Sequence, residues 1–341
     1  MSAYAFGLAA ALSLIGSGAD FGIGALHVAP ASMRGPFEGL EHARRPQRVE
    51  SFWNGLPRPA ERAATSSGIL ALRTPRDRRV RITGGRFVMG STPQEMQDAL
   101  RLCAKEPFGL ACQRGSEHAW DVALAIRAEG HAHEVMLDDF ELDVTEVTVE
   151  KYMRCVAAAA CSPPSFVPGD PRYDVASYPV THVTWQDASN YCAWTGGRLP
   201  TEAEWELAAR GFANRTFPWG NVYNPRLSNH GSYADDPTDG RDGFFGLAPV
   251  GSFPDGATPT GLLDMAGNAA EWVADWYERD EQQFGYPRGA QTNPKGPPFG
   301  SLGHVIRGGS FRDGAHWLRT AARRASSFAE REVGFRCAAS L

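Results

Sequence analysis

Residues 181–211, THVTWQDASNYCAWTGGRLPTEAEWELAARG, contain two short helix patterns separated by a Gly-Gly pair. In the first pattern Thr184 is placed to cap the helix, Asp187 takes the capping-box position in place of Glu, and the Gly-Gly pair ends the helix. In the second pattern Thr201 is the cap, Glu204 lies three residues further on, and a glycine ends the helix. We therefore expect two short helices with well-defined ends.

Strand signals lie on both sides of this segment. Residues 80–91, VRITGGRFVMGS, alternate apolar and polar residues around a Gly-Gly pair, which indicates a hairpin. Residues 92–105 fit a helix, and residues 133–158 fit a strand pair that runs into a helix. The chain has no internal repeat and no regular alternation of strands with helices. We therefore expect a loop-rich α+β fold with short strands and a few helices.

The net charge is −5 and the sequence contains no recognisable nucleic-acid-binding motif, which argues against nucleic-acid binding. The apolar run over residues 3–15 is too short to span a bilayer but has the length of a signal-peptide core. We expect a signal peptide over residues 1–25, export to the periplasm, cell surface or medium, and no transmembrane anchor. A mis-assigned start or an apolar tail is the alternative. Residues 26–79, rich in Arg and Pro, are expected to be a disordered linker.

The even cysteine count supports export, because disulfides persist in oxidising compartments. Two pairs are close in sequence and two cysteines are left far apart. Six cysteines allow 15 pairings, so spacing alone does not fix them. Six buried thiols in a cytosolic protein are the alternative. The cysteines are Cys103, Cys112, Cys155, Cys161, Cys192 and Cys337.

Three stretches could bind a metal ion. His131 and His133 would face the same way on a strand, although scattered histidines at the start of a strand are commoner. Residues 256–276 and residues 229–244 are rich in oxygen-bearing side chains and glycine, a composition that suits Ca²⁺. The alternative for both oxygen-rich stretches is a set of Asx-turns that need no ion.

Seven motifs in order resemble the formylglycine-generating enzyme (sulfatase-modifying factor) family. They are GGRFVMGS, DVTEVTVEKY, PVTHVTWQDASNYCAWTGGRLPTEAEWELAARG, FPWGN, GLLDMAGNAAEWVADW, VIRGGSF and VGFRCA. The resemblance implies one C-type-lectin-like domain over residues 80–341, with an insertion near residues 92–131.

The resemblance also implies a disulfide and two calcium sites. The disulfide joins Cys192 to Cys337, which leaves Cys103–Cys112 and Cys155–Cys161 as the local pairs. Asp264 stands where the family usually has Asn. The first implied site comprises Asn229, His230, Asp242 and Phe244, and the second comprises Asp264, Gly267, Ala269 and Glu271.

Enzymes of this family oxidise a substrate cysteine with O₂ and a copper ion, which two cysteines hold just after the RGGS-aromatic motif. Cu(I) prefers such soft thiolate ligands. In this chain the corresponding window, residues 311–324, contains no cysteine and is shortened, and Asp313 falls near the first cysteine position. We therefore expect no copper and no catalytic residue. We expect a groove floor made of Ser310, Phe311, Asp313, Trp317, Arg319 and Arg323. The alternative is that the arginines are buried scaffold paired with carboxylates.

The resulting functional hypothesis is a binding or accessory module for a peptide, a glycan or a partner protein. One alternative is an oxidoreductase of the family with a diverged active site, either formylglycine-generating or similar to the non-haem-iron relatives. Those iron relatives take their ligands from a separate helical domain that carries histidines. Residues 1–79 contain only His27 and His42, and so cannot be that domain.

Overall fold

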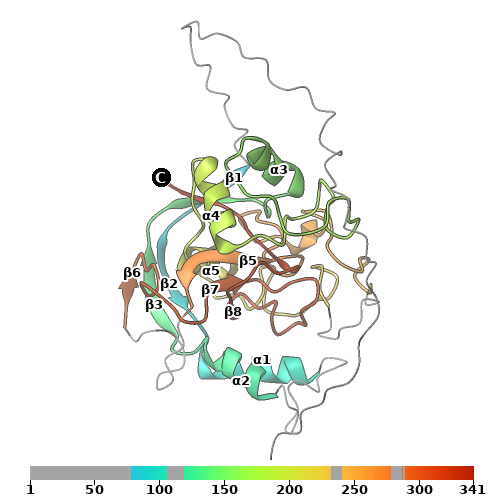
Figure 1. Cartoon of the computed structure of the whole chain (residues 1–341). Helices are drawn as coiled ribbons and strands as arrows, with labels where there is room; N and C mark the ends of the chain where they lie inside the picture. The colour runs from blue at the N-terminus through green and yellow to red at the C-terminus, as the bar shows by residue number, and fades with distance from the viewer. Residues whose placement is uncertain (1–77, 106–118, 232–239, 278–285, 287–288) are drawn as a thin grey trace, which may run out of the picture. The chain divides into compact units, whose positions relative to one another are not determined.

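The computed structural model describes residues 78–105, 119–231, 240–277, 286 and 289–341 (Figure 1). The expected signal peptide over residues 1–25 and the linker up to residue 77 lie outside the described residues. Within the described part of the chain, no helix is both long enough and apolar enough to cross a bilayer.

Five α-helices and ten short strands, separated by long loops, confirm the α+β class for the described residues. The helices are α1 (Pro93–Ala104), α2 (Ala119–Arg127), α3 (Val149–Ala157), α4 (Trp185–Trp194) and α5 (Glu202–Arg210), with a 3₁₀ turn, η2, at Pro254–Gly256. The strands are β1 (Arg79–Ile82), β2 (Gly85–Met89), β3 (His133–Leu137), β4 (Phe140–Asp143), β5 (Ala270–Trp276), β6 (Gln291–Thr292), β7 (His304–Arg307), β8 (Arg323–Ser326), β9 (Val333–Gly334) and β10 (Ala338–Ser340).

The expected hairpin over residues 80–91 is wrong. Strand β1 pairs with β4, and β2 pairs with β3, both antiparallel and in the same register on the two sides of the break. At the break the N–H of Gly84 donates to the Asp139 carboxylate (2.8 Å). A Cβ at Gly84 would collide with the backbone at Leu137 and Asp138. The glycine pair therefore interrupts one long strand pair instead of forming its turn.

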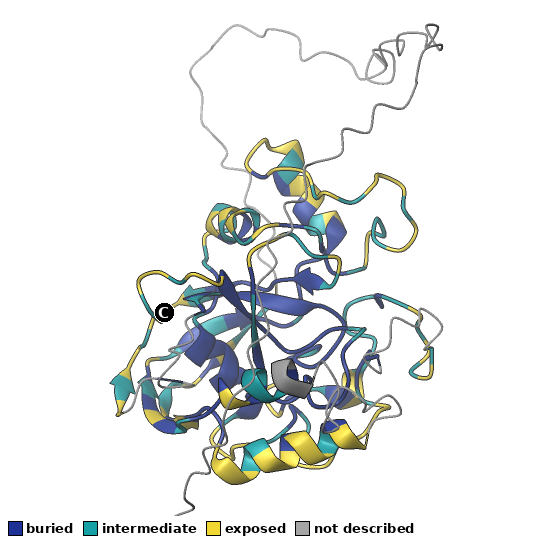
Figure 2. Ribbon diagram, turned by 60° about the horizontal axis from the view of Figure 1, so that its bottom comes forward, coloured by how far each residue is buried: buried dark blue, intermediate teal, exposed yellow. Residues whose placement is uncertain are grey.

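The connection between β2 and β3, where we expect an insertion near residues 92–131, contains α1 and α2. The helix expected at residues 92–105 is confirmed as α1, which begins at a capping box formed by Thr92 and Glu95. Ala99, Val122 and Ile126 belong to a small apolar cluster between the two helices. The rest of α1 is largely exposed (Figure 2).

The two helices expected in residues 181–211 are confirmed, with both capping boxes formed. Helix α5 is buried along all nine of its residues, because it lies against β2, β3, β5 and β7. Those last two strands belong to the sheet of order β8-β7-β5-β9. Such complete burial brings the ionisable side chains of α5 into the core.

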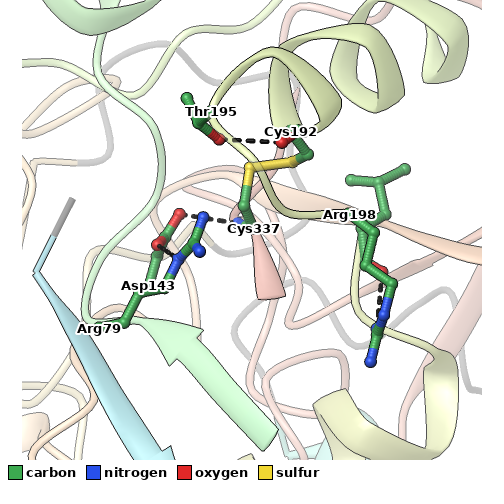
Figure 3. Close-up of a disulfide and its surroundings, with 7 residues drawn as sticks. Arg79, Asp143, Cys192, Thr195, Arg198 and Cys337 are labelled. Atoms are coloured by element: carbon green, nitrogen blue, oxygen red, sulfur yellow. Dashed lines mark hydrogen bonds and ion pairs between the residues drawn. A yellow bond between two sulfur atoms is a disulfide. The ribbon is translucent and has the colours of Figure 1, made fainter. Parts of the chain in front are cut away.

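The structure contains the Cys155–Cys161 and Cys192–Cys337 disulfides, with Cα–Cα distances of 5.3 Å and 5.4 Å. The second joins α4 to the last strand region (Figure 3). The N–H of Cys337 donates to Asp143 (2.9 Å). Cys103 is disulfide-bonded, and Cys112 lies outside the described residues.

Candidate functional site

The loop that follows β7 begins with two glycines in the left-handed region, Gly308 (φ 89°) and Gly309 (φ 68°). The Ser310 N–H and hydroxyl both donate to Asp313 Oδ2 (2.9 and 2.8 Å). Arg324 Nη2 donates to the same oxygen (2.7 Å). Asp313 is buried, and its carboxylate holds the loop in place by accepting hydrogen bonds from both residues.

Arg319 and Glu129 form a buried ion pair. Two guanidinium nitrogens donate to the two carboxylate oxygens at 2.8 and 2.6 Å. Glu129 lies between α2 and β3, so this pair fixes the loop to the insertion. Bidentate pairs of this kind are among the strongest hydrogen-bonded contacts in proteins.

Arg307 and Arg323 are paired in the same manner with α5. Arg323 donates to both oxygens of Glu202 (2.7 and 2.9 Å). Arg307 donates to Glu202 (3.1 Å) and Glu206 (2.6 Å). At the far end of α5, Arg210 donates to Glu206 (2.8 Å). These five side chains are all buried, and we call them the arginine–glutamate layer.

The part of this layer that lies on α5 could have been predicted from the sequence, but we did not predict it. Glu202, Glu206 and Arg210 recur every four residues, which places them along one face of α5. The capping pattern alone assigns Glu204 a role at the helix start and assigns none to Glu202, Glu206 or Arg210. The signal available in the sequence was this row of ionisable residues on one face of a helix whose other residues are mostly apolar.

Asp275, at the end of β5, borders the layer. Its Oδ2 accepts the N–H of Glu202 at the start of α5 (2.7 Å). Burial, reinforced by the nearby Glu202 charge, raises the pKa of Asp275 to about 7.

The six residues expected to form a groove floor are mostly buried. Of the six residues, Ser310, Asp313, Trp317, Arg319 and Arg323 are buried and Phe311 is half-buried. The alternative interpretation of the arginines is the one observed, because Arg319 and Arg323 are paired with carboxylates. Arg319 also lines a cavity of about 240 Å³. The walls of this cavity come from α1, the end of α5 and the loop over residues 216–223, and do not include Phe311 or Trp317.

The two oxygen-rich stretches lie against each other. The Asn268 N–H donates to the Asn229 carbonyl (2.8 Å), and Asn229 Nδ2 donates to Asn268 Oδ1 (2.9 Å). Gly267 has φ 80°, and a Cβ there would collide with the Asn229 carbonyl. The fold thus brings both implied calcium sites together.

At the first implied site, Asp242 accepts the N–H groups of His230 (2.7 Å) and Phe244 (2.9 Å). Asn229 Oδ1 is buried and accepts no hydrogen bond from any described residue. A buried oxygen without a donor is costly. A hard cation that prefers oxygen ligands would satisfy it, so these residues fit Ca²⁺.

At the second implied site, Asp264 has φ 56° and accepts the Gly251 N–H (2.6 Å). Glu146 joins it from the turn before α3, and Glu146 Oε1 accepts the Ala269 N–H (3.3 Å). Burial, reinforced by Asp264, raises the pKa of Glu146 well above its ordinary value, and burial also raises the pKa of Asp264. Sequence reasoning missed Glu146, because nothing in its local pattern marks it as a ligand.

Glu271 also belongs to the second implied site, but its carboxylate is bonded to two other side chains. Its carboxylate accepts from Arg336 (2.7 Å) and from the Trp205 indole (2.8 Å). The described residues contain no cluster of three or more His, Cys, Asp or Glu side chains arranged as metal ligands. A calcium ion at either site would therefore depend on amide and backbone oxygens as well.

The two histidines considered as metal ligands do not share a strand. Strand β3 begins at His133, whereas His131 precedes it with φ 61°. His131 Nδ1 lies 3.0 Å from the Tyr286 carbonyl, and His133 Nδ1 lies 3.0 Å from the His131 carbonyl. The Nδ1 atom of each of these two histidines thus lies within hydrogen-bond distance of a backbone carbonyl.

Comparison with known proteins identifies relatives of this chain. A formylglycine-generating enzyme of Thermomonospora curvata is 41% identical over 184 residues, which are 50% of this chain and 59% of that enzyme. The inactive C-alpha-formylglycine-generating enzyme 2 of Mus musculus is 32% identical over 284 residues, 76% of this chain and 85% of that protein. The chain spans about half the length of several curated formylglycine-generating enzymes that it matches.

A solved structure has the same fold. PvdO from Pseudomonas aeruginosa superposes with a TM-score of 0.54 and 26% identity, covering 77% of this chain and 94% of that one. The fold is thus the C-type-lectin-like fold of the formylglycine-generating enzymes. The family described as sulfatase-modifying factor enzyme 1-like domain matches residues 70–341. The chain therefore belongs to the sulfatase-modifying factor enzyme 1-like family.

Proposed function

We propose that this protein is an exported formylglycine-generating-enzyme-like domain that lacks copper-dependent cysteine oxidase activity and acts as a binding or accessory module. The observation that carries the proposal is Asp313. It stands near the first cysteine position of the family's copper site and is held by three donors from Ser310 and Arg324. A carboxylate so engaged is a poor ligand for Cu(I), which prefers thiolates.

The cysteines support the same conclusion. A copper-binding pair needs two free thiols, whereas the described cysteines are all disulfide-bonded. Disulfides are typical of oxidising compartments, which supports export. Thiol counting on the denatured, non-reduced protein should give no free cysteine. Two or more free thiols would contradict the proposal.

We propose the cavity beside Arg319 as the binding site of this module. The insertion helix α1 forms one wall, and Phe217 and Tyr223 supply aromatic surface. Concave sites with an apolar lining and a few polar groups are the usual ligand sites of proteins. The ligand class we propose is a peptide or glycan segment small enough for a cavity of about 240 Å³.

The test is capture of a ligand from the host, followed by rebinding of the purified ligand. Asp98 lies at this cavity on α1 and pairs with Arg101 (2.7 Å). Asp98→Lys should weaken rebinding at least about tenfold, or about 1.4 kcal/mol. Glu150→Lys is the matched control, since Glu150 is also an exposed helical acid paired with an arginine, Arg154. Equal binding by both variants would place the ligand elsewhere.

We also propose that calcium is the resident ion of the oxygen-rich loops. The unpartnered Asn229 Oδ1 and the all-oxygen donor set support this. The ion would hold the loops around residues 229 and 264–271 in place. Its role in this proposal is structural, and no chemical step depends on it.

A further inference from the structure

One face of helix α1 forms a wall of the cavity beside Arg319. Four residues of that face line the cavity at the helical spacing i, i+3, i+4 and i+7: Glu95, Asp98, Ala99 and Leu102. The other lining residues lie at the end of α5 and in loops. Peptides that bind by adding a strand need the edge of a sheet. Helices and loops instead suit a ligand that is held through its side groups.

All four charged residues that line this cavity form ion pairs. The pairs are Glu95–Arg210 (2.8 Å), Asp98–Arg101 (2.7 Å) and Arg319–Glu129 (2.6 Å). A charged ligand would have to compete with an existing partner, and breaking a buried pair is costly. The lining therefore favours a ligand without net charge.

The other polar residues of the lining are uncharged and offer both donors and acceptors. Asn221 Oδ1 accepts the Thr216 N–H (3.0 Å), which fixes the amide and leaves its NH₂ group to donate. Thr320 Oγ1 donates to a backbone carbonyl (2.6 Å), and Ser91 Oγ donates to Glu129 (2.9 Å). Both hydroxyl oxygens keep lone pairs that can accept a hydrogen bond. This mixture matches the hydroxyl groups of a ligand, each of which donates and accepts.

Tyr223 gives the cavity a flat apolar surface. Its half-buried ring lies 5.7 Å from the ring of Phe217, which stacks on Trp219 at 5.3 Å. Leu102 packs against the same apolar cluster. The Tyr223 ring is therefore held in position before a ligand arrives, which lowers the cost of binding. A sugar ring has an apolar face of C–H groups that such an aromatic surface can contact.

We propose that the cavity beside Arg319 binds one neutral hexose unit of a glycan, with the sugar ring against Tyr223 and its hydroxyl groups on Asn221 and the α1 carboxylates. This inference rests on the proposed binding function and names the ligand class. The volume of about 240 Å³ is below the range of about 300–1,000 Å³ that is usual for drug-sized ligands. The cavity thus suits a single ring, and the rest of the glycan lies outside it.

The test is calorimetric titration of the full chain with three neutral sugars, maltotriose, cellotriose and triacetylchitotriose, and with tetra-arginine and tetra-glutamate peptides. At least one sugar should bind, and neither peptide should. Tyr223→Ala should weaken sugar binding at least about tenfold. Tyr178→Ala is the matched control, because Tyr178 is also half-buried but does not line the cavity, and it should bind like wild type.

If Tyr223→Ala does not fold, Asn221→Ala, at an exposed position, should weaken the same binding. Three results would overturn the hexose assignment: no sugar binds, a charged peptide binds instead, or a folded cavity variant keeps the wild-type affinity for the sugar.

The ligand captured from the host separates this inference from the proposed function. Periodate, which cleaves sugar diols, should abolish rebinding of that ligand. A captured ligand that resists periodate but is weakened by Asp98→Lys would keep the binding module and exclude the hexose. Rebinding that Asp98→Lys leaves unchanged would overturn the cavity as the binding site.

Discussion

The arginine–glutamate layer and the oxygen-rich loops are both buried and polar, yet their hydrogen bonding differs. In the layer, each carboxylate faces a guanidinium, as Glu202 does with Arg323. In the loops, Asn229 Oδ1 and Glu146 Oε2 accept from no described group. Buried polar groups are normally satisfied. Every carboxylate oxygen in the layer has a donor, and only the Nε groups of Arg210 and Arg307 donate to no described group. The loops instead leave acceptor oxygens without a described donor, and a cation would satisfy such oxygens.

The largest expected effect is in the layer. Arg307→Leu would leave Glu206 Oε2 without its donor and would remove one of the two guanidinium groups at each of Glu202 and Glu206 in the core. Removing one partner of a buried pair costs about 3–5 kcal/mol. Denaturant unfolding should show this loss equally in calcium and in EGTA. Arg154→Leu, at an exposed pair, should cost less than about 0.5 kcal/mol. An equally small loss of stability for Arg307→Leu would contradict the idea that the buried layer stabilises the fold more than an exposed ion pair does.

The loops should respond to calcium instead. A ligand at 100 times its Kd stabilises the native state by about 2.7 kcal/mol. EGTA should therefore lower the melting temperature of wild type by several degrees. Asn229→Ala should reduce this calcium response. A melting temperature that is unchanged by EGTA would mean that the loops need no ion.

Asp313 should behave as part of the scaffold. Asp313→Asn weakens the charge-assisted bonds from Ser310 and Arg324. Bonds to a charged group contribute about 1.5–3 kcal/mol, so we expect a loss in that range. The loss should be independent of copper. Copper-dependent stabilisation of wild type that disappears in this variant would show a metal role for Asp313.

Per pH unit, the smallest expected effect is the pH dependence of Asp275. Its pKa in the folded protein is about 7, above its ordinary value of 3.8, because it is buried beside Glu202 and Glu204, with Arg323 opposing. The folded state therefore binds this proton more tightly than the unfolded state. Stability from this group is present at low pH and is lost as pH rises from about 4 to about 7, by at most about 1.4 kcal/mol per pH unit. Asp275→Asn should flatten that slope in unfolding experiments. If the pH dependence of the unfolding free energy is unchanged in this variant, other groups must cause it.

The helix ends around residues 181–211 could be predicted because capping is local chemistry, decided by Thr184, Thr201 and their third neighbours. The strand order could not be predicted. The glycine pair at residues 84–85 has the local signature of a turn, and only the distant pairing with Asp139 makes it a break in a strand.

For the site, the resemblance predicted the Cys192–Cys337 disulfide, which the structure contains, and the two loops that we propose bind calcium. It did not reveal the partners of the arginines or of Asp264. Those partners, Glu129, Glu202 and Glu146, lie far away in sequence, and only the folded chain brings them into contact.

The central claim is that the loop carrying Asp313 has become scaffold in a family whose enzymes oxidise cysteine there. The most direct measurement is mass spectrometry of a cysteine-containing substrate peptide of the family after incubation with this protein, copper and O₂. We predict unmodified cysteine at the level of a protein-free control. Conversion of the cysteine to formylglycine in proportion to the amount of protein would contradict the account.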